Sequence, residues 1–135
     1  MAREVKTAPG ATVLFVDDEP KLCLIVSRIL GEEGYHVFTA ENGLDALKIA
    51  SRVNPEVVVL DINMPVMDGI TILREMRKRG MECPVIMLTA QGTIETAREA
   101  MSLGAFDYMT KPFDLQLFKE TLQDALTGRG DRMGA

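Results

Sequence analysis

The sequence has few of the residues that build disulfide frameworks, zinc sites or catalytic triads. It contains two cysteines and one histidine among 135 residues. Cys23 and Cys83 are far apart, and neither belongs to a CxxC or Cys/His ligand pattern, so both are expected to be small core residues. His36 lies in a strand-like stretch and is not expected to serve in a triad. These absences exclude a disulfide scaffold and a cysteine-ligated zinc site.

Long hydrophobic runs and an excess of positive charge are also absent. The longest apolar stretches, such as residues 57–60, have the length of a strand, whereas a membrane span needs about 20 apolar residues. No signal peptide precedes them, so we expect a cytoplasmic protein without membrane attachment. A net charge of −5 opposes binding to a polyphosphate backbone, and no direct nucleic-acid binding is expected. A basic run in the third predicted helix is interpreted as its solvated face: Arg74, Arg77, Lys78 and Arg79.

The composition is that of a folded domain. Hydrophobic residues make up 47% and charged residues 26% of the chain, and its length fits one domain. We expect this domain to cover residues 11–127, after an N-terminal extension over residues 1–10. Residues 128–135 are glycine-rich and lack a hydrophobic pattern, which is typical of a tail or the stub of a linker.

Five strand-like runs alternate with five helix-like segments. The predicted strands cover residues 13–16, 35–38, 57–60, 84–88 and 106–109. Pro20, Asn42 and Asp114 occupy positions typical of helix starts, and Gly31 and Gly34 are expected to end the first helix. Strict alternation predicts an α/β fold with a doubly wound, five-stranded parallel sheet. We expect it to be flavodoxin-like, with strand order 2-1-3-4-5 and helices on both faces.

Three aspartates follow or end strands that should be neighbours. Asp17 and Asp18 come after the first strand and Asp61 after the third, and ligands of such sheets bind outside the carboxyl ends of the strands. Taken alone, Asp18 is as consistent with a helix cap or a solvated loop as with a metal site. Three converging carboxylates, however, need compensation by a cation, and Mg²⁺ suits a site with few carboxylates, a backbone carbonyl and water.

Two further strand ends add a positive charge and hydrogen-bond donors. Lys111 follows the fifth strand, and its ammonium group can pair there with a carboxylate or a phosphoryl oxygen. Thr89 ends the fourth strand, where its hydroxyl and the N–H of Ala90 come within reach of a phosphoryl group at Asp61. The five positions therefore predict one site for a metal ion and a phosphoryl group.

This ordered set of motifs resembles bacterial response-regulator receiver domains of the CheY-like kind. The likeness covers residues 11–127, with no departure at the five central positions. The motifs are Asp17-Asp18, Asp61-Ile62-Asn63-Met64-Pro65-Val66-Met67-Asp68-Gly69, Thr89-Ala90 and Lys111-Pro112-Phe113. The resemblance implies a phosphoacceptor of a two-component system, in which Asp61 attacks the phosphohistidine of a sensor histidine kinase.

The resemblance also implies a metal-ligand set. Asp18 and Asp61 would bind Mg²⁺ directly, together with the backbone carbonyl of Asn63, and Asp17 would act through the coordination shell. The domain would promote only its own Mg²⁺-dependent phosphorylation and slow dephosphorylation, and it would not be an enzyme in any wider sense.

A switch is implied as well. Lys111 and Thr89 would hold phosphoryl oxygens, and Tyr108 would turn inward as Thr89 moves. The surface of the fourth helix, fifth strand and fifth helix would then change for an output partner, a fused effector domain or a phosphorylation-dependent dimer. The alternative for Tyr108 is a half-exposed strand residue without a signalling role.

Two other functions fit part of the pattern. A Mg²⁺-dependent phosphatase of the haloacid-dehalogenase type also uses an aspartyl nucleophile, but its motif has a second aspartate where this chain has Asn63. A flavodoxin-like FMN carrier needs a phosphate-binding loop after the first strand, but that loop begins here with three acidic residues, 17–19, which repel phosphate unless a metal intervenes. No P-loop motif is present.

The sequence leaves the output open. Gly92-Thr93 before the fourth helix, and residues 104–108 after it, are similar to receivers attached to sigma-54-dependent activators. A stand-alone receiver that works by protein contact is the competing interpretation.

Overall fold

The computed structural model describes residues 10–90 and 94–128, in which strands and helices alternate without exception. The strands are β1 (Thr12–Val16), β2 (His36–Ala40), β3 (Val57–Asp61), β4 (Val85–Thr89) and β5 (Asp107–Thr110). The helices are α1 (Pro20–Glu32), α2 (Gly43–Val53), α3 (Gly69–Lys78), α4 (Ile94–Ser102) and α5 (Leu115–Thr127). Gly92 and Thr93, which carried the likeness to activator receivers, lie outside the described residues, as do most of the predicted extension and tail.

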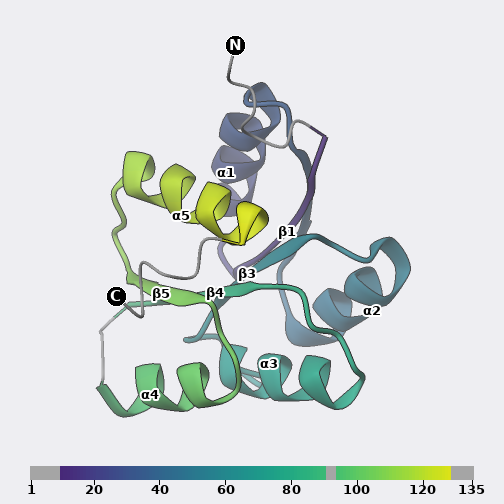
Figure 1. Ribbon diagram of the computed structural model, residues 1–135, viewed down its shortest axis with the longest axis vertical. Helices are drawn as coiled ribbons and strands as arrows, with labels where there is room; N and C mark the ends of the chain where they lie inside the picture. The colour runs from purple at the N-terminus through teal and green to yellow at the C-terminus, as the bar shows by residue number, and fades with distance from the viewer. Residues whose placement is uncertain (1–9, 91–93, 129–135) are drawn as a thin grey trace.

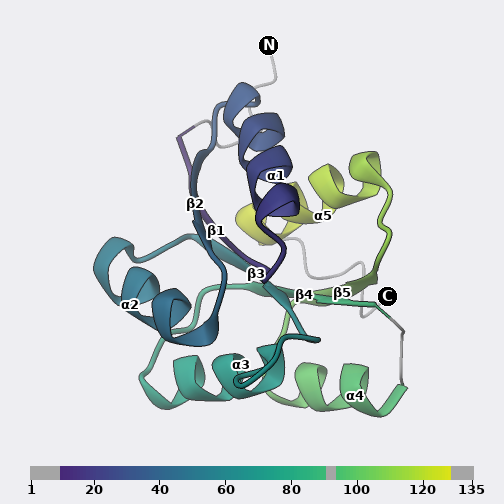
Figure 2. The same cartoon turned by 180° about the vertical axis from the view of Figure 1, so that it is seen from behind.

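The five strands form one parallel sheet in the order β2-β1-β3-β4-β5. Helices α1 and α5 cover one face, and α2, α3 and α4 cover the other (Figures 1 and 2). Every residue of β3 and β4 is buried, as expected for strands covered on both sides. The predicted doubly wound, flavodoxin-like α/β fold is confirmed.

The core consists of two apolar layers separated by the sheet. Successive side chains of a strand point to opposite faces, so Val13 and Phe15 pack toward α1 and α5, while Leu14 and Val16 pack toward α2, α3 and α4. On the α5 side, Phe15 meets the ring of Phe118 edge to face, with centroids 6.4 Å apart. Because helices pack on both faces of the sheet, the strands and their carboxyl ends are held in fixed positions.

The predicted helix starts are correct, and one predicted helix end is wrong. Pro20 is the first residue of α1, and the side chains of Asn42 and Asp114 accept backbone N–H bonds of 2.8 and 2.9 Å at the starts of α2 and α5. Gly34 has a φ of 99° in the turn after α1, a conformation that glycine adopts without strain. Gly31, in contrast, lies inside α1, because the helix continues to Glu32.

Strands β2 to β5 run one or two residues further toward their carboxyl ends than hydrophobicity predicts, whereas β1 ends at Val16 as predicted. The sequence predicted a second strand over residues 35–38, whereas β2 spans His36–Ala40. Asp61 and Thr89 likewise belong to β3 and β4, where they pair in register with Leu88 and Thr110. Backbone pairing does not require an apolar side chain, so polar residues can continue a strand.

Arg77 is not the solvated residue that the basic run of α3 suggested. Its guanidinium group donates hydrogen bonds to four backbone carbonyls, those of Met81, Cys83, Leu103 and Gly104, at 2.7 to 3.2 Å. Lys78 and Arg79 in the same run are exposed, as predicted. Arg77 therefore ties the end of α3 to the loop before β4 and to the end of α4.

We expect Arg77→Met to lower the free energy of unfolding by about 2 kcal/mol, because hydrogen bonds to a charged group are stronger than neutral ones and several carbonyls lose their donor. Lys78→Met, one residue later on an exposed surface, should change it by less than about 0.5 kcal/mol. Equilibrium unfolding in urea compares the two variants. Equal effects would mean that Arg77 contributes no more than a surface charge.

Within the described ranges, no helix is both long enough and apolar enough to cross a membrane.

Candidate functional site

The ends of the strands bring together the residues that the sequence singled out. Asp17 follows β1, Asp61 and Thr89 are the last residues of β3 and β4, and Lys111 follows β5. The Nζ atom of Lys111 lies 2.8 Å from Oδ2 of Asp17 and 3.3 Å from Oδ2 of Asp61. The predicted convergence of these strand ends is therefore present.

Three carboxylates form an acidic cluster that could hold a metal ion. One ligand oxygen from each of Asp17, Asp18 and Asp61 lies within 4.8 Å of the others. Asp17 is 0% exposed and Asp61 is 2% exposed, whereas Asp18 is open to solvent. Three ionised carboxylates beside the ammonium group of Lys111 give a net charge of −2, which one divalent cation would neutralise.

Asp17 is fixed by its own backbone and by its neighbours. Its N–H donates to the carbonyl of Ala40 at 3.0 Å, and its Oδ1 accepts the N–H of Glu19 at 2.9 Å. The thiol of Cys23 lies 3.3 Å from the Asp17 carbonyl. Burial, and then the charge of Asp17, raise the pKa of Cys23 to about 11, so the thiol stays protonated and can donate this bond.

The other oxygen of Asp17 has no hydrogen-bond donor among the described residues. The ammonium group of Lys111 is the ion-pair partner of this Oδ2 atom, at 2.8 Å. A buried carboxylate requires a compensating charge, and Lys111 supplies one positive charge for the carboxylates of Asp17 and Asp61. The hard oxygen donors, their net charge and this oxygen together fit Mg²⁺.

The environment affects the two partners of the ion pair in different ways. Burial is the largest influence on Asp61 and raises its pKa; the charge of Asp17 acts in the same direction, while the N–H of Asn63 and Lys111 oppose it. Burial alone would lower the pKa of Lys111, but Asp17 and Asp61 outweigh it and raise that pKa. Lys111 therefore stays charged, and burial destabilises the ionised form of Asp61 relative to the protonated form.

Asn63 makes contacts that the sequence did not predict. Its N–H donates to Oδ1 of Asp61 at 3.0 Å, and its side-chain Oδ1 accepts the N–H of Ala90 at 2.8 Å. The hydroxyl of Thr89 also lies 3.5 Å from this Oδ1. The sequence pointed only to the backbone carbonyl of Asn63, because the direction of an exposed loop side chain leaves no periodic signal.

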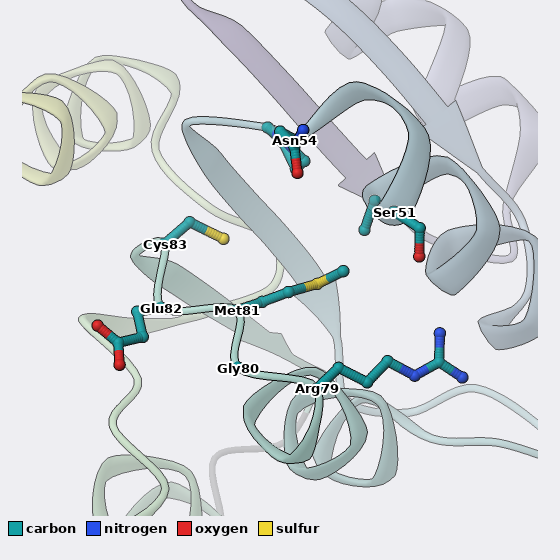
Figure 3. Close-up of a pocket in the computed structure, with 9 residues that line it drawn as sticks. Ser51, Asn54, Arg79, Gly80, Met81, Glu82 and Cys83 are labelled. Atoms are coloured by element: carbon teal, nitrogen blue, oxygen red, sulfur yellow. The ribbon is translucent and has the colours of Figure 1, made fainter.

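Tyr108 lies apart from this cluster, with 40% of its surface exposed. On β5 it lines a shallow groove with Phe113 and Leu117, beside α5. A second hollow lies at the amino ends of β3 and β4, between the end of α2 and the loop after α3, and is lined by residues that include Asn54 and Cys83 (Figure 3). The acidic site lies at the carboxyl ends of the strands, so this hollow is not part of it.

The family model of the response regulator receiver domain matches residues 13–123. The chain belongs to this family. Among curated relatives, it is 44% identical over 114 residues to the regulatory protein AtoC of Escherichia coli, a match that covers 84% of this chain and 25% of AtoC. It is 36% identical over 114 residues to sporulation initiation phosphotransferase F of Bacillus subtilis, covering 84% of this chain and 92% of that protein.

Solved receiver structures have the same fold. Chemotaxis protein CheY4 of Vibrio cholerae superposes with a TM-score of 0.82 at 35% identity, covering 87% of this chain and 99% of CheY4. The BeF₃-activated receiver domain of RstA from Klebsiella pneumoniae gives a TM-score of 0.79 at 27% identity, covering 85% of this chain and 97% of that domain.

The family assignment gives the general function. The chain is a receiver domain of a two-component response regulator, which acts as a phosphoacceptor switch. The family takes its phosphoryl groups from histidine kinases, and many members carry output domains. The chain spans 25% of AtoC but 92% of the sporulation protein, so both longer and single-domain relatives occur. The phosphatase alternative is not supported.

Proposed function

We propose that Asp61 is the phosphoacceptor, in a Mg²⁺-dependent reaction with the phosphohistidine of a sensor histidine kinase. The observation that carries this proposal is a nearly buried carboxylate at the end of the central strand, beside a lysine and two further carboxylates. The P–N bond of the phosphohistidine breaks, and a P–O bond to a carboxylate oxygen of Asp61 forms. The electron pair of the broken bond remains on the imidazole nitrogen.

The metal site would be formed by Asp18, Asp61 and the backbone carbonyl of Asn63, with Asp17 in the surrounding coordination shell. When bound, Mg²⁺ neutralises charge on the transferring phosphoryl oxygens. Lys111 supports the same step from the side of β5, because its ammonium group already lies between Asp17 and Asp61. Positioning and charge neutralisation are what phosphoryl transfer requires of a protein.

The domain proposed for this role covers residues 11–127, with residues 1–10 as an extension and residues 128–135 as a tail or linker stub. It would work in the cytoplasm and would dephosphorylate itself slowly. Its output would be a partner protein, an attached effector or a phosphorylation-dependent dimer, without direct contact to nucleic acid by this domain.

Intact-protein mass spectrometry after incubation with acetyl phosphate or a phosphoramidate tests the proposal. We expect one phosphoryl adduct per chain, formed only with Mg²⁺ and lost slowly. Rapid consumption of many donor equivalents without an adduct would instead indicate a hydrolase. Beryllofluoride, which activates the receiver domain of RstA, should bind at Asp61 and serve as a stable substitute for the phosphoryl group.

Tyr108→Ala should leave phosphorylation intact and weaken the response. The exposed ring lies on β5 beside α5, and in the proposed switch it fills the space that Thr89 leaves. We expect the active fraction with beryllofluoride to fall about fivefold, at the low end of typical coupling energies. Amide chemical shifts of α4, β5 and α5 measure this fraction, and Tyr108→Phe, which keeps the ring, is the control. If the alanine variant reached the same active fraction as the wild type with beryllofluoride, Tyr108 would have no part in the switch.

A further inference from the structure

The side chain of Asn63 connects the end of β3 to the end of β4. Its Oδ1 accepts the N–H of Ala90 at 2.8 Å and lies 3.5 Å from the hydroxyl of Thr89. Through its own N–H, the same residue donates to Oδ1 of Asp61 at 3.0 Å. One loop residue thus contacts both the proposed phosphoacceptor and the two donors opposite it.

Those two donors are the groups that a phosphoryl oxygen on Asp61 would need. A backbone N–H has a single hydrogen, so a good bond to one acceptor excludes an equally good bond to another. The amide oxygen of Asn63 is a neutral acceptor, whereas a phosphoryl oxygen is charged and forms the stronger bond. The Asn63 oxygen and a phosphoryl oxygen on Asp61 would therefore compete for the N–H of Ala90, and the charged oxygen would form the stronger bond.

We propose that the side chain of Asn63 is a resting-state latch, which occupies the N–H of Ala90 beside the Thr89 hydroxyl until a phosphoryl group displaces it. The inference rests on the proposed function of Asp61. The latch opposes phosphorylation, because its contact with Ala90 is lost when the phosphoryl group arrives. Asn63 and Ala90 are both exposed, so water can replace the lost contact and the effect is modest. One neutral hydrogen bond corresponds to about threefold to tenfold in affinity.

Binding of beryllofluoride in the presence of saturating Mg²⁺ tests the latch. Asn63→Ala removes the acceptor, and Asn63→Leu removes it while keeping nearly the same shape. Val66→Ala is the control in the same loop, because the Val66 side chain is fully exposed. Each dissociation constant is followed by ¹⁹F and amide NMR. Hydrogen exchange of the Ala90 amide without ligand reports the resting contact, and the Mg²⁺ affinity is measured separately for every variant.

We expect both Asn63 variants to bind beryllofluoride about threefold to tenfold more tightly than the wild type. The Ala90 amide should exchange faster in both, and Val66→Ala should match the wild type. Unchanged or weaker binding by the Asn63 variants, beside a wild type that binds well, would overturn the latch and leave the proposed function intact. Tighter binding by Asn63→Ala alone would overturn it too, since steric exclusion would then be the cause. A wild type that binds no beryllofluoride would overturn both proposals.

Discussion

Asp61→Asn should take up no phosphoryl group under conditions in which the wild type gains one Mg²⁺-dependent adduct. The substitution keeps the shape of the side chain but replaces a charged oxygen by a neutral amide, which is a poor nucleophile and a weaker ligand for Mg²⁺. The adduct should fall below detection, the largest effect expected for any single substitution in this chain. Intact-protein mass with and without Mg²⁺ measures it.

The same variant should be more stable than the wild type without Mg²⁺, which separates loss of function from loss of folding. Burial raises the pKa of Asp61 above its ordinary value of 3.8, so the ionised form is disfavoured in the folded state. The wild type therefore loses stability as the pH rises from about 3.8 through the raised pKa. The asparagine variant lacks this loss, and thermal unfolding across that pH range checks the difference.

Asp68→Asn is the matched control for both measurements. Asp68 is exposed in the same loop, and its side chain caps α3 by accepting the N–H of Thr71 at 2.9 Å. Asparagine caps helices as well as aspartate does, so stability and adduct formation should be unchanged. An adduct that survives in Asp61→Asn would instead place the phosphoacceptor on another residue, with Asp17 and Asp18 the first to examine.

Residues far apart in the sequence could be assigned to one site because parallel strands end at one edge of the sheet. Asp61 and Lys111 are 50 positions apart, yet their side chains meet at 3.3 Å. The spacing of apolar runs places the strand ends, and the strand order then decides which of them are neighbours. The fold and the convergence of the charged residues were predictable for this reason.

Contacts that depend on the path of a loop were not predictable. Arg77 was interpreted as solvated because a charge on a helix usually is, but its carbonyl partners come from two loops whose geometry has no signature in hydrophobicity. The bond from Ala90 to the side chain of Asn63 is another such case. The end of α1 could not be predicted to the residue, because the sequence does not show which of two nearby glycines adopts a positive φ. In the structure this residue is Gly34 and not Gly31.

Gly69→Ala should cost about 3 kcal/mol of stability, near the upper end for overpacking. A Cβ atom built on Gly69 would lie 2.5 Å from the carbonyl oxygen of Asp61 and 2.9 Å from Cα of Ile62. Both are backbone atoms of the segment that carries the proposed phosphoacceptor, so no side-chain rotation can relieve the clash. Either α3 or the end of β3 has to move, and a shift of about 1 Å at Asp61 would slow phosphoryl uptake roughly a hundredfold.

Two other glycines give controls for the same substitution. Gly31 has open space around its Cβ position inside α1, so Gly31→Ala should raise the free energy of unfolding by about 0.5 to 1 kcal/mol. The three atoms nearest to a Cβ on Gly43 all belong to the side chain of Met67, which can move, so the effect of Gly43→Ala on stability should lie between those of the other two substitutions. Urea unfolding and the rate of phosphoryl uptake rank the series. If Gly69→Ala matched Gly31→Ala in both, the contact between α3 and the end of β3 would not be what positions Asp61.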